Sequence, residues 1–179
     1  RTSDRKKGIL FLLKALHILK SEGVKVNLTV VDEVELNETY APDLIKKFGI
    51  EDMVSFTGRV TNDELVHHYS SSDIAVTASV YEGFGLPAAE AMSCSVPVIT
   101  TSAGALPEVV GSDGGSGMLV PPEDPRALAD AIKRLLGDAE LRGKLAVGGR
   151  KRIEERFTWE ACARRCVQVY EGAIAANKG

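Results

Sequence analysis

Short apolar segments rich in β-branched residues alternate with helical segments along most of this chain, and that order constrains its fold more than any other feature. The strand candidates are residues 24–31, 53–56, 73–79, 96–100 and 118–120. The helix candidates are residues 9–19, 40–48, 61–69, 86–94, 107–110, 125–136, 139–157 and 158–175. Buried strands separated by helices predict an α/β fold, with a Rossmann-like parallel sheet covered by helices on both faces. Ligands of such folds bind beyond the carboxyl ends of the strands.

Several helix boundaries carry residues that start or stop a helix. Thr61 and Glu64 have the spacing of a capping box, and Thr158 stands as the N-cap of the last helix. Gly49 follows the second helix, where a left-handed glycine commonly ends a helix. Pro87 falls in the first turn of the helix at 86–94, where its missing N–H costs nothing. These signals agree with the alternating order.

The composition is typical of one soluble globular domain. The chain has 179 residues, of which 44% are hydrophobic and 26% charged, and its formal net charge is -3. This balance lacks the basic excess of a nucleic-acid-binding protein, and no apolar run approaches the roughly 18 residues of a membrane span. Three cysteines without the spacing of a metal finger favour a reducing compartment. The chain opens at Arg1 without an initiator methionine, which we interpret as a cut within a longer protein.

A glycine-rich turn between two glutamates is the most informative motif, and it has the sequence Glu82-Gly83-Phe84-Gly85-Leu86-Pro87-Ala88-Ala89-Glu90. Glycines allow the main chain to approach an anion closely, and the unpaired N–H groups of the first helical turn point toward it. The turn is therefore expected to hold a phosphate. A carboxylate on each side of an anion site suits a ligand with hydroxyl donors at both ends, such as a sugar joined through a diphosphate to a ribose.

Further short segments accompany this turn in a characteristic order. They are Phe56-Thr57-Gly58-Arg59-Val60, Asp63-Glu64-Leu65, Ser71-Ser72-Asp73, Ala91-Met92, Val96-Pro97-Val98, Leu106-Pro107-Glu108-Val109, Gly117-Met118-Leu119-Val120-Pro121-Pro122 and Arg156-Phe157-Thr158-Trp159. With the two glutamates, they resemble the C-terminal, donor-binding domain of retaining GT-B glycosyltransferases, particularly glycosyltransferase family 4 (group 1). The resemblance implies that residues 1–179 are the C-terminal half of a GT-B fold that lacks its first strand, with the N-terminal acceptor domain absent from this chain.

The resemblance assigns the two glutamates to opposite ends of a nucleotide sugar. Glu90 is implied to accept hydrogen bonds from the ribose hydroxyls, and Glu82 to contact the transferred sugar near the leaving group. The amides of the turn are expected to face the diphosphate or the sugar; they belong to Gly83, Phe84, Gly85 and Leu86. The alternative roles are a helix-dipole partner for Glu90 and a solvated loop acid for Glu82. The Phe84 side chain is expected to pack rather than to stack on a base.

Two cations, Arg1 and Lys7, are implied to clamp the diphosphate. They would neutralise the charge that develops on the departing diphosphate and could do the work of a metal, so we expect neither a metal ion nor another cofactor. The alternative is that the basic tract at 1–7 is simply solvated. The loop at Arg59 and Val60 is implied to meet the base through its backbone, and a purely structural role remains open there.

The sequence departs from the family pattern at two places. Where the family has a glycine-containing turn after its second strand, this chain has Val31-Asp32-Glu33-Val34-Glu35, which affects the contacts made there. Ser95 stands where the family commonly has a glycine, which changes the local backbone.

The predicted function is that of the donor-binding domain of a hexosyltransferase that uses a nucleoside-diphosphate sugar and retains the anomeric configuration. The acceptor, a sugar, a lipid or a small molecule, would bind through the missing N-terminal domain. We expect a cytoplasmic enzyme, compatible with peripheral membrane association, and an isolated chain that binds donor weakly and transfers little. The alternatives are a non-catalytic nucleotide-sugar-binding module, one subunit of a two-chain transferase, or a GT-B epimerase or phosphorylase, although no motif for a pyridoxal-phosphate lysine is evident.

Overall fold

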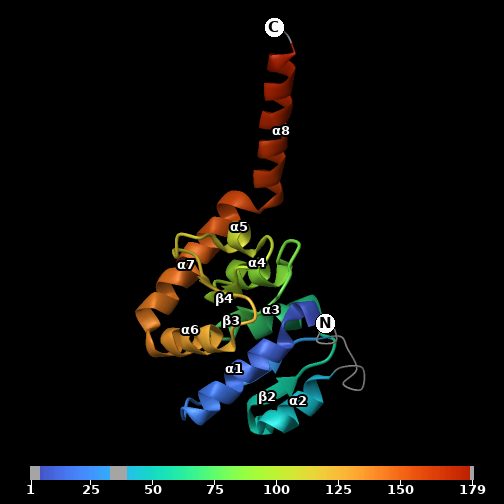
Figure 1. Cartoon of the computed structure of the whole chain (residues 1–179). Coiled ribbons are helices and arrows are strands. Elements are labelled where there is room, and N and C mark those ends of the chain that lie inside the picture. Colours follow the sequence, from blue (N-terminus) through green and yellow to red (C-terminus); the bar gives the residue numbers. More distant parts are fainter. Residues whose placement is uncertain (1–4, 33–39, 178–179) are drawn as a thin grey trace.

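The structure, a computed structural model, describes residues 5–32 and 40–177. Helices and strands alternate as far as residue 120, and helices alone follow, as the sequence predicts (Figure 1). The elements are η1 (Arg5–Lys7), α1 (Ile9–Ser21), β1 (Leu28–Val30), α2 (Ala41–Phe48), η3 (Glu51–Met53), β2 (Val54–Phe56), α3 (Asn62–Ser70), β3 (Ala75–Thr77), α4 (Leu86–Ser93), β4 (Val98–Thr101), α5 (Leu106–Val110), β5 (Met118–Val120), α6 (Pro125–Gly137), α7 (Ala139–Arg156) and α8 (Trp159–Ala176).

The strands form two parallel sheets. β1 pairs with β2, and Leu28 lies opposite Val54. β4 lies between β3 and β5, and Ala75 of β3 lies opposite Val98. The parallel α/β class is therefore confirmed. The predicted sheet is, however, divided in two within the described residues, because β1 and β3 are not paired with each other.

Burial along each strand follows the number of its neighbours. All four residues of β4, which has a partner on each side, are buried. In β1 and β3, which are paired on one side only, every residue is half-buried or exposed. Both strands are also shorter than predicted: β1 covers 28–30 instead of 24–31, and β3 covers 75–77 instead of 73–79. Each strand has a parallel partner on one side only within the described residues, which limits the ladder to the residues that face that partner.

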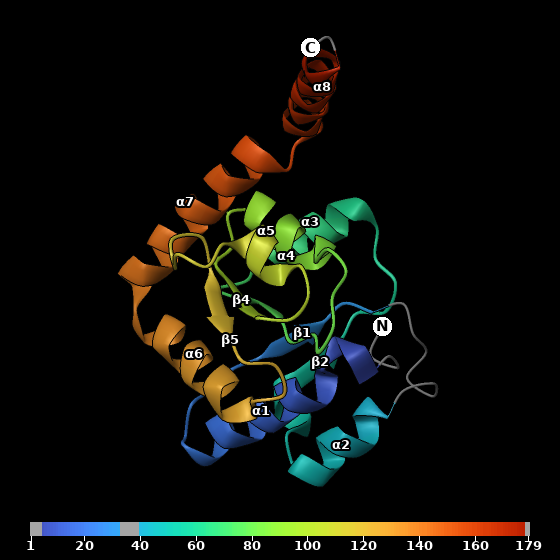
Figure 2. The same cartoon turned by 45° about the horizontal axis from the view of Figure 1, so that its top comes forward.

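The helices cover both faces of the strands. Successive residues of β4 point to opposite faces: Ile99 packs in the cluster that contains Leu13 of α1 and Leu135 of α6, and Val98 packs in the cluster that contains Met92 of α4. α1 contacts α2 and α6, whereas α4 contacts α5 and α7. Figure 2 shows these two groups of helices on opposite sides of the strands. The predicted arrangement is thus confirmed.

The helix-end signals act as predicted. Both hydrogen bonds of the capping box between Thr61 and Glu64 are present, and the Thr158 hydroxyl accepts the amide N–H of Ala161 at 3.2 Å. Ser95, which follows α4, has a φ of 58°. An L-residue pays about 1–2 kcal/mol in this left-handed conformation and glycine pays almost none, which explains the glycine that the family commonly has here.

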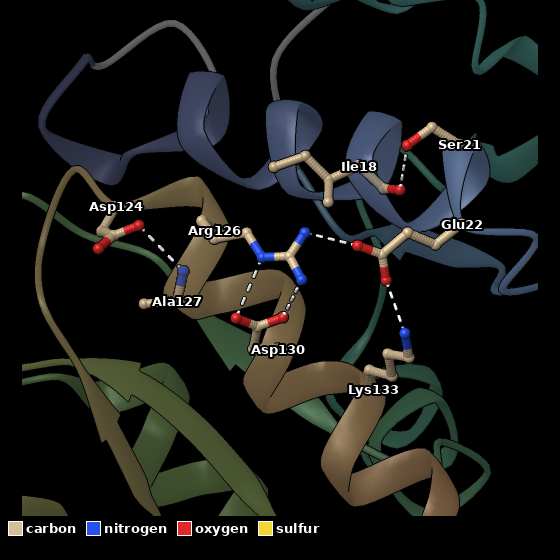
Figure 3. Close-up of polar contacts among 8 residues, drawn as sticks. All are labelled: Ile18, Ser21, Glu22, Asp124, Arg126, Ala127, Asp130 and Lys133. Atoms are coloured by element: carbon tan, nitrogen blue, oxygen red, sulfur yellow. Dashed lines mark hydrogen bonds and ion pairs between the residues drawn. The ribbon is translucent and has the colours of Figure 1, made fainter.

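A group of ion pairs joins α1 to α6 (Figure 3). The carboxylate of Glu22, at the end of α1, accepts from Arg126 at 2.5 Å and from Lys133 at 2.7 Å. Arg126 also pairs with Asp130 at 2.8 Å, one helical turn away. The hydrogen bond from Lys133, followed by that from Arg126, lowers the pKa of Glu22. These contacts fix α6 against the helix that follows η1.

The last helix, α8, runs away from the rest of the molecule (Figure 1). Trp159 is 88% exposed, and Ala161 is the residue of this helix that is buried. Cys162 and Cys166 are exposed on α8 as free thiols. None of the helices in the described residues is long and apolar enough to cross a bilayer.

Candidate functional site

The turn that follows β3 brings Glu82 and Lys7 together. The Glu82 side chain is only 12% exposed, and its Oε2 accepts from the Lys7 ammonium at 2.8 Å. The same oxygen accepts the hydroxyl of Ser79 at 3.1 Å, and Ser79 is itself buried. An acid and a cation 75 positions apart in the sequence thus form one polar cluster at the carboxyl end of β3, which is the edge where the sequence predicts a ligand site.

Lys7 is placed there by a close contact between the start of α1 and the chain beyond β3. The amide of Val80 donates to the carbonyl of Lys6 at 2.7 Å. Gly8 has a φ of 69°, and a Cβ at this position would lie 1.8 Å from the carbonyl oxygen of Ala78. Only glycine fits this close approach, because the backbone is left-handed and a methyl group would overlap the carbonyl. The Lys7 side chain, which is 39% exposed, keeps its charge accessible to a ligand.

The glycine-rich turn leads into α4 as predicted. Gly85 is the N-cap residue of α4, and Pro87 lies in its first turn. Gly83, Phe84 and Leu86 are exposed, whereas Gly85 is buried. An anion can therefore approach the turn from the exposed side of Gly83 and Leu86. The Phe84 ring packs edge-on against Phe157, with 5.9 Å between the ring centroids, which confirms the predicted packing role of this side chain.

The loop after β4 supports the Glu82 backbone, a contact that the sequence did not reveal. The amide of Ala105 donates to the Glu82 carbonyl at 3.1 Å. A Cβ on Gly104 would lie 2.0 Å from that same carbonyl oxygen, and the Thr101 hydroxyl donates to the carbonyl of Ser79. The residues on both sides of the turn are therefore held by β4 and its loop. The small residues around Gly104 are the one local signal of this close approach.

Glu90 lies on the exposed side of α4 and is contacted from α3. The hydroxyl of Tyr69 donates to Glu90 Oε2 at 3.2 Å. Burial is the main cause of the raised pKa of Tyr69, and the negative charge of Glu90 adds to it. The phenol therefore stays protonated and keeps donating at physiological pH. No motif in the sequence marks Tyr69 as a site residue.

A groove of about 840 Å³ runs between β1 and β3. Lys7, Glu82 and Pro87 line it where the strands end, and Tyr69 is also among its lining residues. The structure thus gathers Lys7 and Glu82 in the groove and connects Glu90 to it through Tyr69.

The other predicted residues lie outside this groove. Arg59 and Val60 belong to the loop between β2 and α3, and neither lines the groove. Arg59 is exposed and Val60 is half-buried. Arg1 lies outside the described residues. Residues 5–32 and 40–177 contain no group of three or more side chains that could together hold a metal ion.

Fold and site together define an α/β domain with a glycine-rich turn between two acids, Glu82 and Glu90, after the carboxyl end of β3. Residues 2–152 match the family described as "Glycosyl transferases group 1", and the chain belongs to that family. The MMP alpha-(1->4)-mannosyltransferase of Mycolicibacterium hassiacum is 40% identical over 94% of this chain and 41% of its own length. The D-inositol 3-phosphate glycosyltransferase of Kineococcus radiotolerans is 35% identical over 76% of this chain and 34% of its own.

Solved structures agree with this assignment. The sucrose-phosphate synthase of Thermosynechococcus elongatus has a TM-score of 0.85 and 34% identity, over 98% of this chain and 44% of its own. The C-terminal domain of a glycosyl transferase group 1 family protein (LpcC) of Francisella tularensis has a TM-score of 0.76 and 31% identity, over 87% of this chain and 82% of its own. The predicted fold class, a Rossmann-like half of a GT-B fold, is confirmed. The chain spans about 41% of the length of the curated mannosyltransferase that it matches.

Proposed function

We propose that this chain is the C-terminal, nucleotide-sugar-binding domain of a retaining hexosyltransferase of glycosyltransferase family 4. The observation that carries the proposal is the cluster of Lys7, Ser79 and Glu82, which lies beside an exposed glycine-rich turn at the carboxyl end of β3. A cation, a carboxylate and open backbone amides suit a ligand that combines a diphosphate with a sugar. The membership of the chain in the glycosyl transferases group 1 family also supports the proposal.

Each charged group receives a role within this proposal. The Lys7 ammonium has three N–H donors, so it can keep one contact with Glu82 while another reaches a phosphate oxygen. Lys7, together with Arg1, would neutralise the charge that develops on the departing diphosphate, and no metal would be needed. Glu82 would hold the transferred sugar, and Glu90 the ribose hydroxyls. The leaving phosphate would help to deprotonate the acceptor, as the resemblance to the family implies.

The names of the similar proteins support the proposed class of donor more than any one class of acceptor. A mannosyltransferase, an inositol-phosphate glycosyltransferase and a sucrose-phosphate synthase differ in what they glycosylate, yet this chain resembles all of them over one domain. A solved structure of Anabaena HepE, described as a complex with UDP and glucose, shares the fold at 23% identity and a TM-score of 0.81. We therefore assign donor binding to this domain and acceptor choice to the rest of a longer, cytoplasmic enzyme, whose peripheral membrane association would depend on that other part.

The groove between β1 and β3 is larger than the polar cluster at its end requires. It follows both strands and has an apolar lining on the helical side, from Ile9, Leu12 and Leu16 of α1 and Ile132 and Leu136 of α6. Each of the two strands is paired on one side only, so each has an edge with unpaired backbone groups. Half-buried strands in the middle of an α/β domain are unusual, since such strands are normally covered on all sides.

We infer that a parallel strand from residues preceding Arg1 occupies this groove and joins the two sheets. The hydrogen bond between Val80 and Lys6 places the chain before α1 beside the segment that leaves β3. A strand parallel to β1 and β3 would end at that point and continue through α1 into β1, as a crossover between parallel strands requires. This strand would be the missing first strand. The donor site would then lie at the carboxyl end of a continuous sheet.

Titration of the full-length protein with UDP-, GDP- and ADP-sugars tests the proposed function. We expect one of these donors to bind and Glu90→Ala to weaken that binding strongly. Glu82→Ala should weaken binding of the nucleoside-diphosphate sugar more than binding of the free nucleoside diphosphate. Glu160→Ala, in an exposed position of α8, serves as the matched control and should bind as the wild type does. Absence of binding to any of the three donors, or unchanged binding by Glu90→Ala, would contradict the proposal.

A further inference from the structure

The contact between Tyr69 and Glu90 joins a half-buried residue to an exposed one. The half-buried Tyr69 side chain packs against the hydrophobic cluster that contains Ala88 and Met92 of α4. Glu90 is exposed and has three rotatable side-chain bonds. The hydrogen bond of 3.2 Å between them therefore ties a flexible carboxylate to a hydroxyl whose position is set by the core.

We propose that Tyr69 is a positioning residue, which holds the Glu90 carboxylate in the orientation that receives the ribose hydroxyls of the nucleotide. This inference rests on the proposed function and adds to it a residue from α3. A free glutamate loses rotamer freedom when it binds a ligand, and that loss weakens binding. Tyr69 restricts Glu90 before the nucleotide arrives, so part of that loss no longer opposes binding.

The hydrogen-bonding capacity of the carboxylate fits this role. An ionised carboxylate offers about four acceptor positions on its two oxygens. Tyr69 occupies one position on Oε2, which leaves enough for two vicinal hydroxyl donors. The phenol is neutral, so it orients Glu90 without an opposite charge that would compete with the ligand.

The experiment compares Tyr69→Phe with the wild type in the full-length protein. Phenylalanine keeps the half-buried ring and removes only the hydroxyl. Tyr170→Phe, at an exposed position of α8, is the matched control for a lost phenol. Binding of UDP, GDP and ADP is measured beside the 2′,3′-dideoxy form of each nucleotide. Melting temperatures are recorded for every variant, so that a loss of folding is seen independently of binding.

We expect Tyr69→Phe to weaken binding of the preferred ribonucleotide by about three- to tenfold, the size of the net contribution of one typical intramolecular hydrogen bond. Binding of its dideoxy form should stay within twofold of the wild type. In a Glu90→Ala background the same substitution should have no further effect, because its target is gone. Tyr170→Phe should match the wild type with both forms of the nucleotide.

Three results would overturn the inference: wild-type affinity in Tyr69→Phe, an equal loss for both forms of the nucleotide, or losses that add fully to those of Glu90→Ala. If the wild type binds a ribonucleotide, Glu90→Ala does not, and Tyr69→Phe binds it with wild-type affinity, then the role of Tyr69 is wrong and the proposed function stands. If the wild type binds none of the three nucleotides, the proposed function fails with it.

Discussion

Replacement of Gly8 by alanine offers a quantitative test of how the start of α1 is fixed against β3. Gly8 precedes α1 and Gly23 follows its last turn, and the two have nearly equal φ angles of 69° and 73°. A Cβ on Gly23 would meet nothing within 4 Å, whereas a Cβ on Gly8 would lie 1.8 Å from the Ala78 carbonyl oxygen. The pair therefore separates the cost of the backbone conformation from the cost of the clash.

The conformational cost should be similar at both sites, about 1–2 kcal/mol for an L-residue in the left-handed region. Only Gly8→Ala must also move the Ala78 carbonyl by more than an ångström, since real Cβ atoms essentially never come within 3.0 Å of another heavy atom. That shift would break the Val80–Lys6 hydrogen bond and disturb the core beneath α1. We expect a total loss of about 3 kcal/mol or more for Gly8→Ala, within the range of strongly disruptive substitutions.

Urea unfolding of the two variants and the wild type measures the difference, provided that all three transitions have the same slope. Donor binding gives a second readout: Gly8→Ala should weaken it, because Lys7 is the preceding residue and would move away from Glu82, and Gly23→Ala should leave it unchanged. Equal losses of stability in the two variants, within about 0.5 kcal/mol, would refute the close approach of Gly8 to Ala78.

Three further predictions concern stability. Glu22→Gln should destabilise the protein slightly at pH 7. The folded pKa of Glu22 lies below its ordinary value of 4.5, so the difference in stability between the variant and the wild type should disappear as the pH falls through the folded pKa. Thermal melts across that pH range measure this difference. Ser95→Gly should raise stability by up to about 1 kcal/mol in urea, since it relieves a left-handed serine, and a loss would contradict that. A chain extended by its natural residues before Arg1 should melt at a higher temperature than residues 1–179, and equal melting would count against a strand in the groove.

The parts of the fold that depend on local sequence could be predicted. The order of helices and strands follows from hydrophobic periodicity, and the capping box at Thr61 and the cap at Thr158 mark their helices through contacts only three residues apart. The division into two sheets could not be predicted, because it depends on what lies between β1 and β3 rather than on either segment. The ion pairs of Glu22 with Arg126 and Lys133 were missed for a related reason, since they join residues more than a hundred positions apart.

Prediction of the candidate site from the sequence is limited in the same way, by contacts between residues far apart in the chain. Glu82, Glu90 and Lys7 were singled out because their motifs resemble those of a known family, and the structure places two of them in direct contact. The contacts that hold these residues, from Tyr69 and from the loop at Gly104, leave almost no trace in the sequence. Tyr69 belongs to no motif, and only the structure shows that its hydroxyl lies beside Glu90 of α4.

The most direct test of donor binding at the glycine-rich turn is a crystal structure of the full-length protein. The crystals would contain the nucleoside-diphosphate sugar that binds best. We expect the diphosphate to lie against the backbone of Gly83–Leu86 and within reach of Lys7. We also expect the ribose hydroxyls within hydrogen-bond distance of the Glu90 carboxylate, and the sugar beside Glu82. A donor bound elsewhere, with the ribose away from Glu90 or the diphosphate away from this turn, would contradict the proposal.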